Sequence, residues 1–334
     1  MNQQVDFNGK SVLITGGTGS FGRKFTEIVL KRYKPEKLII FSRDESKQYE
    51  MSRIFSDQEY LCLRYFIGDV RDITRLQRAF YGVDYVVHAA ALKHVPTAEY
   101  NPIETIKTNI IGAENVLNAA VDSGVKKVIA LSTDKAASPA NLYGATKLCA
   151  DKLLTSGNVY SGFRNTRFSV VRYGNVLGSR GSVVPLFESL RSTGSLPITD
   201  PGMTRFWITL KQGVDFVLKC FSSMSGGEIF VPKIPSMKIV DLATAMAPDC
   251  KHEMVGIRPG EKLHETLITE DDGRHTLEFE DRYIIEPEFK WWINERHLKN
   301  GGKAVPEGFR YSSNTNDCWL TAPELQQLLL ESSD

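Results

Sequence analysis

The chain has 334 residues, enough for one large domain or two coupled domains. Hydrophobic residues make up 42% and charged residues 24%, an ordinary globular composition that excludes a disordered chain. The formal net charge of +1 argues against nucleic-acid or membrane-surface binding as the main role, because both need a basic excess.

Other features of the composition narrow the class further. No apolar run approaches the ~20 residues of a membrane span, and the first ten residues lack the layout of a secretion signal. The five cysteines are far apart, which is typical of reduced thiols in a cytoplasmic protein. The six histidines are dispersed, so we expect no metal site.

Short apolar segments alternate with longer amphipathic segments in the first half of the chain. The short segments predict buried strands at Ser11–Thr15, Lys37–Phe41, Tyr65–Ile67, Tyr85–His88, Lys127–Leu131 and Arg167–Arg172. The longer segments predict helices at Phe21–Tyr33, Glu45–Phe55, Ile73–Tyr81, Pro102–Ser123 and Tyr143–Thr155. This alternation indicates a Rossmann-like, doubly wound α/β fold with a parallel sheet.

After about residue 175, glycine and proline become frequent and the helical segments are shorter. We expect residues 1–175 to form a dinucleotide-binding Rossmann domain. Residues 176–334 should form a smaller, mixed, mainly substrate-binding region, with some segments returning to the first domain. Asn175–Lys233 and the segment around Ile257–Leu267 should cover the carboxyl edge of the sheet, where ligands of this fold bind.

A glycine-rich turn directly follows the first predicted strand. Gly16 permits the tight turn, Gly19 permits close approach of a pyrophosphate, and Gly22 permits close packing of helix on strand. The pyrophosphate would lie on free N–H groups at the start of the helix. The alternative is an ordinary glycine turn, but the strand–turn–helix context favours a dinucleotide site.

The end of the second predicted strand bears on the choice of cofactor. Arg43, with Ser42 and Lys47, is suited to a 2′-phosphate and therefore to NADP. In the alternative, Arg43 is solvated and Asp44 binds the ribose of NAD. The predicted cofactor contacts are Gly16, Thr18, Gly19, Ser20, Phe21, Gly22, Ser42, Arg43, Lys47, Asp69, Val70, Ala89, Ala90, Lys93, Tyr143 and Lys147.

Two groups of residues have the chemistry of proton transfer. Tyr143 and Lys147 are one helical turn apart, so an ammonium can lower the pKa of the phenol and make it a base. Thr133, Asp134 and Lys135 follow the fifth strand, at the edge that faces the ligand crevice. Thr133 can bond a reacting oxygen, Asp134 can act as an acid, and Lys135 can act as a base if burial and nearby cations lower its pKa.

Each group also has a plainer interpretation. Tyr143 could be an exposed residue of a surface helix. Asp134 and Lys135 could form a surface pair in a solvated turn.

These residues resemble the extended short-chain dehydrogenase/reductase family of nucleotide-sugar enzymes. Within it, Thr-Asp-Lys in place of Thr-Asp-Glu is similar to the inverting UDP-N-acetylglucosamine 4,6-dehydratases, which open pseudaminic acid synthesis. Further segments that carry the resemblance are Ser42–Glu45, His88–Pro96, Tyr173–Val176, Gly178–Pro185, Met203–Trp207, Arg258–His264 and Tyr311–Asn316, with Trp319 and Leu320. Asp271–Lys303 matches no functional pattern.

The resemblance implies a redox-neutral lyase reaction with a tightly bound, regenerated NADP. Tyr143 takes the proton of the sugar 4-hydroxyl, Lys135 removes the C5 proton, and Asp134 protonates the departing 6-hydroxyl. Reprotonation on the opposite face inverts C5 and gives UDP-2-acetamido-2,6-dideoxy-β-L-arabino-hex-4-ulose. The product would serve flagellin or surface glycosylation.

The resemblance also implies substrate contacts and a homo-oligomer, a dimer or a hexamer, formed through Pro102–Ser123 and Tyr143–Thr155. The implied substrate contacts are Lys93, Asn175, Val176, Thr199, Met203, Arg205, Arg258 and Glu261. In the alternative, these residues are solvated surface residues.

Three other functions share the same motifs. A UDP-sugar 4-epimerase would use the same Tyr–Lys pair, but it needs no acid and base for C5 and C6. A non-catalytic NADP-sensing protein would typically lack the Tyr or the Lys. A plain reductase would consume NADPH stoichiometrically.

Overall fold

The computed structural model describes residues 5–288 and 296–333. Within these residues, ten strands form one twisted sheet in the order β16-β14-β15-β10-β6-β5-β4-β1-β2-β3. Its parallel part consists of β1 (Ser11–Thr15), β2 (Lys37–Ser42), β3 (Leu63–Ile67), β4 (Tyr85–His88), β5 (Lys127–Thr133), β6 (Arg167–Tyr173) and β10 (Ile229–Pro232). The antiparallel strands are β15 (Arg282–Ile285), β14 (Thr276–Glu278) and β16 (Lys303–Ala304).

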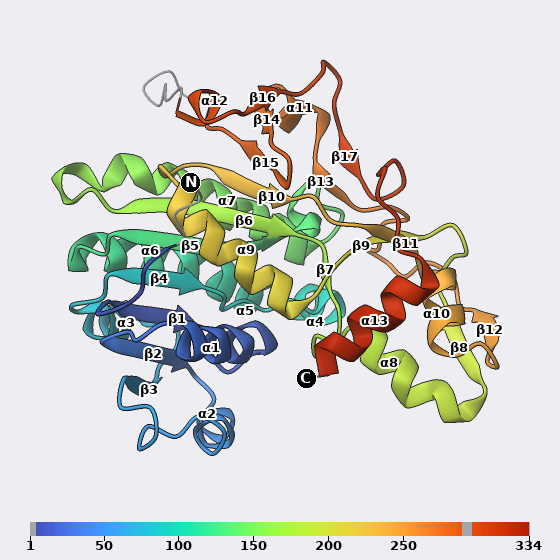
Figure 1. The fold of residues 1–334 in the computed structure, drawn as a ribbon, viewed down its shortest axis with the longest axis horizontal. Helices are drawn as coiled ribbons and strands as arrows, with labels where there is room; N and C mark the ends of the chain where they lie inside the picture. The colour runs from blue at the N-terminus through green and yellow to red at the C-terminus, as the bar shows by residue number, and fades with distance from the viewer. Residues whose placement is uncertain (1–4, 289–295, 334) are drawn as a thin grey trace.

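Helices cover both faces of this sheet (Figure 1). On one side α9 packs against α1, and on the other α6 packs between α3 and α7. The helices that accompany the parallel strands are α1 (Ser20–Arg32), α2 (Glu45–Ser52), α3 (Ile73–Phe80), α4 (Val95–Tyr100), α5 (Pro102–Ile106), α6 (Gly112–Ser123), α7 (Leu142–Tyr160) and α9 (Leu210–Ser223). The predicted doubly wound α/β fold is confirmed.

A second, smaller cluster has its own core around Trp207 and Leu242 and lies at the right of the view in Figure 1. Its elements are β7 (Asn175–Val176), α8 (Val183–Leu190), β8 (Ser195–Ile198), β9 (Thr204–Ile208), β11 (Ser236–Lys238), α10 (Ile239–Met246), β12 (Lys251–Met254) and α13 (Ala322–Ser333). The remaining short elements are β13 (Thr266–Ile268), α11 (Glu270–Gly273), α12 (Arg296–Lys299), β17 (Tyr311–Ser312) and three 3₁₀ helices at Asp134–Ala136, Gly162–Arg164 and Arg191–Thr193. Within the expected covering segment Asn175–Lys233, α9 and β10 instead belong to the main sheet and its helical layers.

The predicted elements differ from the observed ones mainly at their ends. Strand β5 extends to Thr133 because β6 pairs with it, residue by residue, as far as Tyr173. Helix α7 begins after Asn141, whose side chain accepts a hydrogen bond from the Gly144 N–H. It also continues through Gly157, where a Cβ would lie 2.6 Å from Leu117 Cδ1, so the glycine permits close packing on α6.

The predicted helix Pro102–Ser123 is interrupted by a π-helical turn at Lys107–Ile111. Asn109 in this turn is buried, and its amide bonds the backbone N–H and C=O of Leu92 and the hydroxyl of Thr146. The extra residue of a π turn re-aims side chains, and such turns often lie at functional sites. Leu92 itself lines the cavity described below, so the interruption supports one wall of that cavity.

Candidate active site

A cavity of about 650 Å³ lies at the carboxyl ends of the parallel strands. It includes the gap between β1 and β4, where the strand order reverses, which is the place where doubly wound folds bind ligands. The cavity is lined by every residue that the sequence predicts for the cofactor, and also by Thr133, Lys135, Asn175 and Val176. Sequence segments far apart in the chain therefore meet at one site.

The glycine-rich turn shapes one end of the cavity. Gly16 has φ +65°, and a Cβ there would lie 2.9 Å from Ala90 Cα, so any side chain would meet the backbone after β4. A Cβ on Gly22 would lie 2.2 Å from the Gly17 carbonyl oxygen. Gly19 begins α1 with no side-chain cap, so the N–H groups of the first turn remain available to an anion. These features fit the pyrophosphate of a dinucleotide.

The end of β2 presents a cation to the same cavity. The Arg43 side chain is more than half exposed, and its Nη1 lies 3.8 Å from Asp69 Oδ2. Asp44 instead caps α2, accepting a hydrogen bond from the Lys47 N–H, and pairs with Lys47 Nζ at 2.7 Å. The carboxylate that would bind the ribose diol of NAD also lines the cavity, but it is engaged within its own helix.

Tyr143 and Lys147 both line the cavity from the first turns of α7. Lys147 donates a hydrogen bond to the Leu131 carbonyl oxygen at 2.6 Å, and burial lowers its pKa although Asp151 opposes this. Burial raises the pKa of Tyr143 to about 12, and the cation that opposes the rise most is Lys135. An ammonium does act to lower this pKa, but it is that of Lys135 and not that of Lys147, and burial outweighs it.

The segment after β5 forms a hydrogen-bonded group of three residues. The Thr133 hydroxyl donates to Asp134 Oδ1 at 2.8 Å, and Lys135 Nζ donates to the same oxygen at 3.0 Å. Asp134 is fully buried, and its other oxygen, Oδ2, has no hydrogen-bond partner. A surface pair in a solvated turn is therefore ruled out for Asp134.

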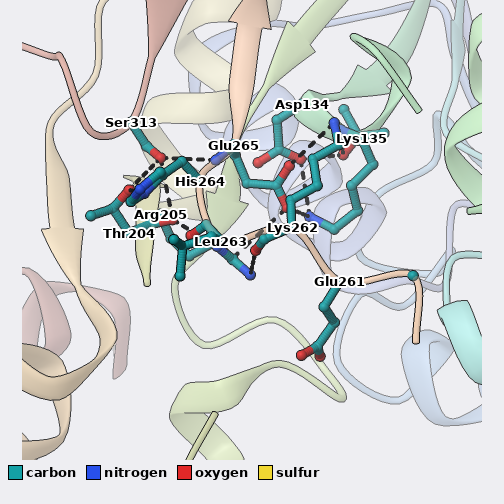
Figure 2. A network of polar contacts seen from close by, with 12 residues as sticks. Asp134, Lys135, Thr204, Arg205, Glu261, Lys262, Leu263, His264, Glu265 and Ser313 are labelled. Carbon is teal, nitrogen blue, oxygen red and sulfur yellow. Dashed lines mark hydrogen bonds and ion pairs between the residues drawn. The ribbon is translucent and has the colours of Figure 1, made fainter. Parts of the chain in front are cut away.

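Lys135 differs from the expectation in its protonation. Burial lowers its pKa, but Asp134 and Glu265 together outweigh burial, so the pKa lies above its ordinary value. Nζ lies 3.2 Å from Glu265 Oε1, and this carboxylate is almost fully buried (Figure 2). Burial and the cation of Arg205 do act to lower this pKa, but the two carboxylates beside the ammonium outweigh them, so the condition set for Lys135 as a base is not met.

Two of the predicted substrate contacts have polar groups at the cavity. Lys93 lines it and donates to the Arg180 carbonyl oxygen at 2.9 Å, and burial lowers its pKa with help from Lys135. Asn175 lines it from β7, next to Val176, and its Oδ1 is buried without a hydrogen-bond partner. Both groups can bond a polar ligand.

The other predicted substrate contacts lie outside the lining. Met203 is buried in the core of the smaller cluster, and Thr199 is half-buried beside it. Arg205 is buried and donates to the carbonyl oxygens of Thr204, Lys262 and Leu263, so its guanidinium is directed at backbone. Arg258 and Glu261 pair with each other at 3.8 Å on a more exposed part of the same loop.

Two residues of the site were missed by the sequence analysis. Glu265 directly follows the Arg258–His264 motif, but only the fold brings it to Lys135. Asp151 is buried on α7, accepts a hydrogen bond from Ser132 at 2.7 Å and pairs with the buried Arg172. The spacing of Asp151, one helical turn beyond Lys147, could have indicated a counter-ion for that lysine.

Two further features of the described residues concern metal binding and membrane insertion. Neither stretch, 5–288 or 296–333, contains a group of three or more potential metal-ligating side chains. No described helix combines the length and apolarity that crossing a membrane requires.

The sequence pattern of a family described as "Polysaccharide biosynthesis protein" matches residues 12–287. The chain belongs to this family. An inverting UDP-N-acetylglucosamine 4,6-dehydratase from Campylobacter jejuni is 58% identical over 97% of this chain and 98% of the relative. A UDP-glucose 4-epimerase from Rickettsia massiliae is 41% identical over 97% and 96%. The resemblance to the inverting dehydratases is therefore confirmed.

Solved structures agree with this classification. The structure of Pen from Bacillus thuringiensis superposes with a TM-score of 0.88 at 38% identity and covers 98% of this chain and 100% of that chain. A dTDP-glucose 4,6-dehydratase from Streptomyces venezuelae, DesIV, solved with NAD bound, has a TM-score of 0.67 at 23% identity and covers 76% and 86%. The second likeness shows the fold alone.

Proposed function

We propose that the chain is an NADP-dependent UDP-N-acetylglucosamine 4,6-dehydratase that inverts C5. The observation that carries this proposal is the meeting, at one cavity, of Tyr143 and Lys147 with Lys135, whose ammonium is hydrogen-bonded to Asp134, a buried residue outside the lining. The relative at 58% identity, named for the same activity, supports it. Family membership alone also admits epimerases.

The proposed reaction divides between two sets of residues. When bound, NADP would accept a hydride from C4 of the sugar and return it to C6. Tyr143 takes the proton of the 4-hydroxyl, with the Lys135 ammonium, and Lys147 one helical turn along α7, favouring the phenolate. Burial raises the pKa of Tyr143, and a positively charged nicotinamide bound beside it would favour the phenolate.

The acid and the base of the elimination can arise from one proton transfer. Lys135 Nζ already donates to Asp134 Oδ1 at 3.0 Å. Transfer of that proton converts the ammonium and carboxylate into an amine and a carboxylic acid without changing the total charge. The amine then removes the C5 proton, and the Asp134 acid protonates the leaving 6-hydroxyl, so that water departs. Thr133, hydrogen-bonded to Asp134, holds the acid in place.

The preference for NADP is also a proposal. It is supported by the exposed Arg43 at the cavity and by the engagement of Asp44 in capping α2. The remaining parts of the proposal are a cytoplasmic location, a homo-oligomer and a product that enters pseudaminic acid synthesis. Exposed Tyr100, Ile103 and Ile111 near α5 support an interface between copies, which light scattering of the purified protein would measure.

Proton NMR of UDP-N-acetylglucosamine incubated with the protein in D₂O tests the function. We expect a new C6 methyl signal, deuterium at C5 and an L-arabino ring pattern. A methyl signal with retained C5 configuration would contradict the inversion but keep the dehydratase. No reaction, even with NADP⁺ added, would contradict the substrate assignment.

The second candidate function is a UDP-sugar 4-epimerase, which the relative at 41% identity favours. An epimerase needs the Tyr143–Lys147 pair but has no use for a buried acid and base beside it. Formation of only the 4-epimer in the same NMR experiment would establish this function. Stoichiometric consumption of NADPH would instead indicate a reductase, and cofactor binding without turnover a sensing protein.

A further inference from the structure

Glu265 is a buried carboxylate that the proposed reaction has not used. It directly precedes β13 and is 2% exposed. Its Oε1 lies 3.2 Å from Lys135 Nζ and 3.9 Å from Arg205 Nε, and its Oε2 lies 3.8 Å from Lys262 Nζ. Three cations therefore converge on one carboxylate (Figure 2). Lys135 lines the cavity and Glu265 does not, so any effect of Glu265 on substrate passes through the lysine.

The backbone of Glu265 is fixed on both sides by a distant part of the chain. Its N–H donates to the Ser313 hydroxyl at 2.9 Å, and its carbonyl oxygen accepts from the Ser313 N–H at 2.8 Å and the Ser312 hydroxyl at 3.1 Å. The loop before it is also held, because Lys262 Nζ donates to the Ala137 carbonyl oxygen at 2.7 Å. The carboxylate is thus held in position against Lys135.

The balance of charge in this cluster depends on Glu265. Without it, the ammonium of Lys135 would face Arg205 and Lys262 with Asp134 as the nearest remaining anion. Like charges in a buried site disfavour the charged form of a lysine, and an opposite charge favours it. The ionisable groups that act on Lys135 or are acted on by it are Asp134, Glu265, Arg205, Lys262, Tyr143 and Lys93.

We propose that Glu265 is a positioning residue for the C5 step: it holds the Lys135 amine beside Asp134 and sets the pH at which that amine becomes a base. This inference rests on the proposed dehydratase function. Hydride transfer at C4 should respond less to Glu265 than the C5 step does, because Glu265 acts on Tyr143 only through Lys135, one of several groups that act on the phenol. Hydride transfer at C4 and proton exchange at C5 can therefore be measured separately on the same sample.

The test is the pH profile of C5 exchange in the Glu265→Gln variant. Glutamine has the same shape without the charge. Loss of the carboxylate destabilises the Lys135 ammonium, so the apparent pKa of the C5 step should move by about one unit or more toward lower pH. Deuterium incorporation at C5 measures this step, and absorbance of the reduced nicotinamide in a single turnover measures the hydride step, whose profile should move less.

Glu270→Gln provides the matched control, since it removes an exposed carboxylate five positions further along the same segment. Its C5 profile should equal that of the wild type. Glu265→Asp keeps the charge but withdraws it from Lys135, and it should give a smaller shift in the same direction. If the Glu265→Gln variant does not fold, the Glu265→Asp variant is sufficient for the test.

The outcomes separate this inference from the function on which it rests. An unshifted C5 profile in a folded Glu265 variant, with normal wild-type exchange, overturns the role of Glu265 alone. A shift of the hydride profile by the same amount also overturns it, because the effect of Glu265 would then not be specific to the C5 step. A wild-type protein that exchanges no C5 proton overturns the dehydratase function and this role together.

Discussion

The two ends of the cavity differ in what forms them. At the cofactor end, glycine backbone and the start of α1 form the wall, and the contacts come from short stretches that follow single strands. At the catalytic end, Lys135 lines the cavity, and outside the lining it meets charges from separate segments: Asp134 after β5, Arg205 on β9, and Lys262 and Glu265 before β13. Substitutions that change the shape of a side chain should therefore impair the cofactor end most. Substitutions that change a charge or a proton-transferring group should impair the catalytic end most.

The largest expected effect is at the catalytic end. Tyr143→Phe removes a single oxygen and should slow hydride transfer by about 10²–10⁴-fold, because the base at O4 is lost. Substrate binding should persist, as equilibrium titration would show. Tyr160→Phe, on the exposed part of the same helix, is the control and should react normally. Near-normal turnover of the Tyr143 variant would refute its role.

Lys135→Arg keeps the positive charge but removes the ability to act as a base, because a guanidinium does not lose its proton. Deuterium exchange at C5 should fall by about 10²–10⁴-fold while hydride transfer at C4 remains. The same substitution at exposed Lys152 on α7 should change neither rate. If C5 inversion continued at the normal rate, charge alone would be sufficient at this end of the cavity.

At the cofactor end, Gly22→Ala tests the importance of shape. The added methyl would meet the Gly17 carbonyl oxygen at 2.2 Å, so overpacking should lower the stability by about 1–3 kcal/mol and weaken NADP binding. Gly213→Ala on α9, whose Cβ would only touch Phe21 at 3.8 Å, should be neutral or stabilising. Thermal unfolding and a cofactor titration measure both effects. Equal melting temperatures for the two variants would contradict the steric account.

The smallest expected effect comes from Arg43, a charged residue at the cofactor end, where shape otherwise matters most. Arg43→Ala should weaken NADP binding by about tenfold, the value of one charge-assisted hydrogen bond, and leave NAD binding nearly unchanged. Arg53→Ala, which removes an exposed arginine after α2, should affect neither cofactor. Tighter NAD than NADP binding by the wild type would contradict the proposed preference.

The lining of the cavity was predictable from sequence because its contacts are local. The spacing of Gly16, Gly19 and Gly22 expresses the geometry of one turn, and Tyr143 and Lys147 lie on one face of a helix. Strand ends in a parallel sheet share an edge, so placing Thr133 and Asn175 near the turn needed only the strand positions. These residues line the cavity as expected.

The tertiary structure alone decided the charge balance at the catalytic end. Lys135 and Glu265 are 130 positions apart in the sequence. The Arg205 guanidinium, which was expected to bind a phosphate, instead donates to backbone carbonyl oxygens beside this cluster. The sequence determined which residues could transfer protons, because their types and strand-end positions are local properties. Burial and the approach of distant charges set their pKa values, and both depend on how the whole chain packs.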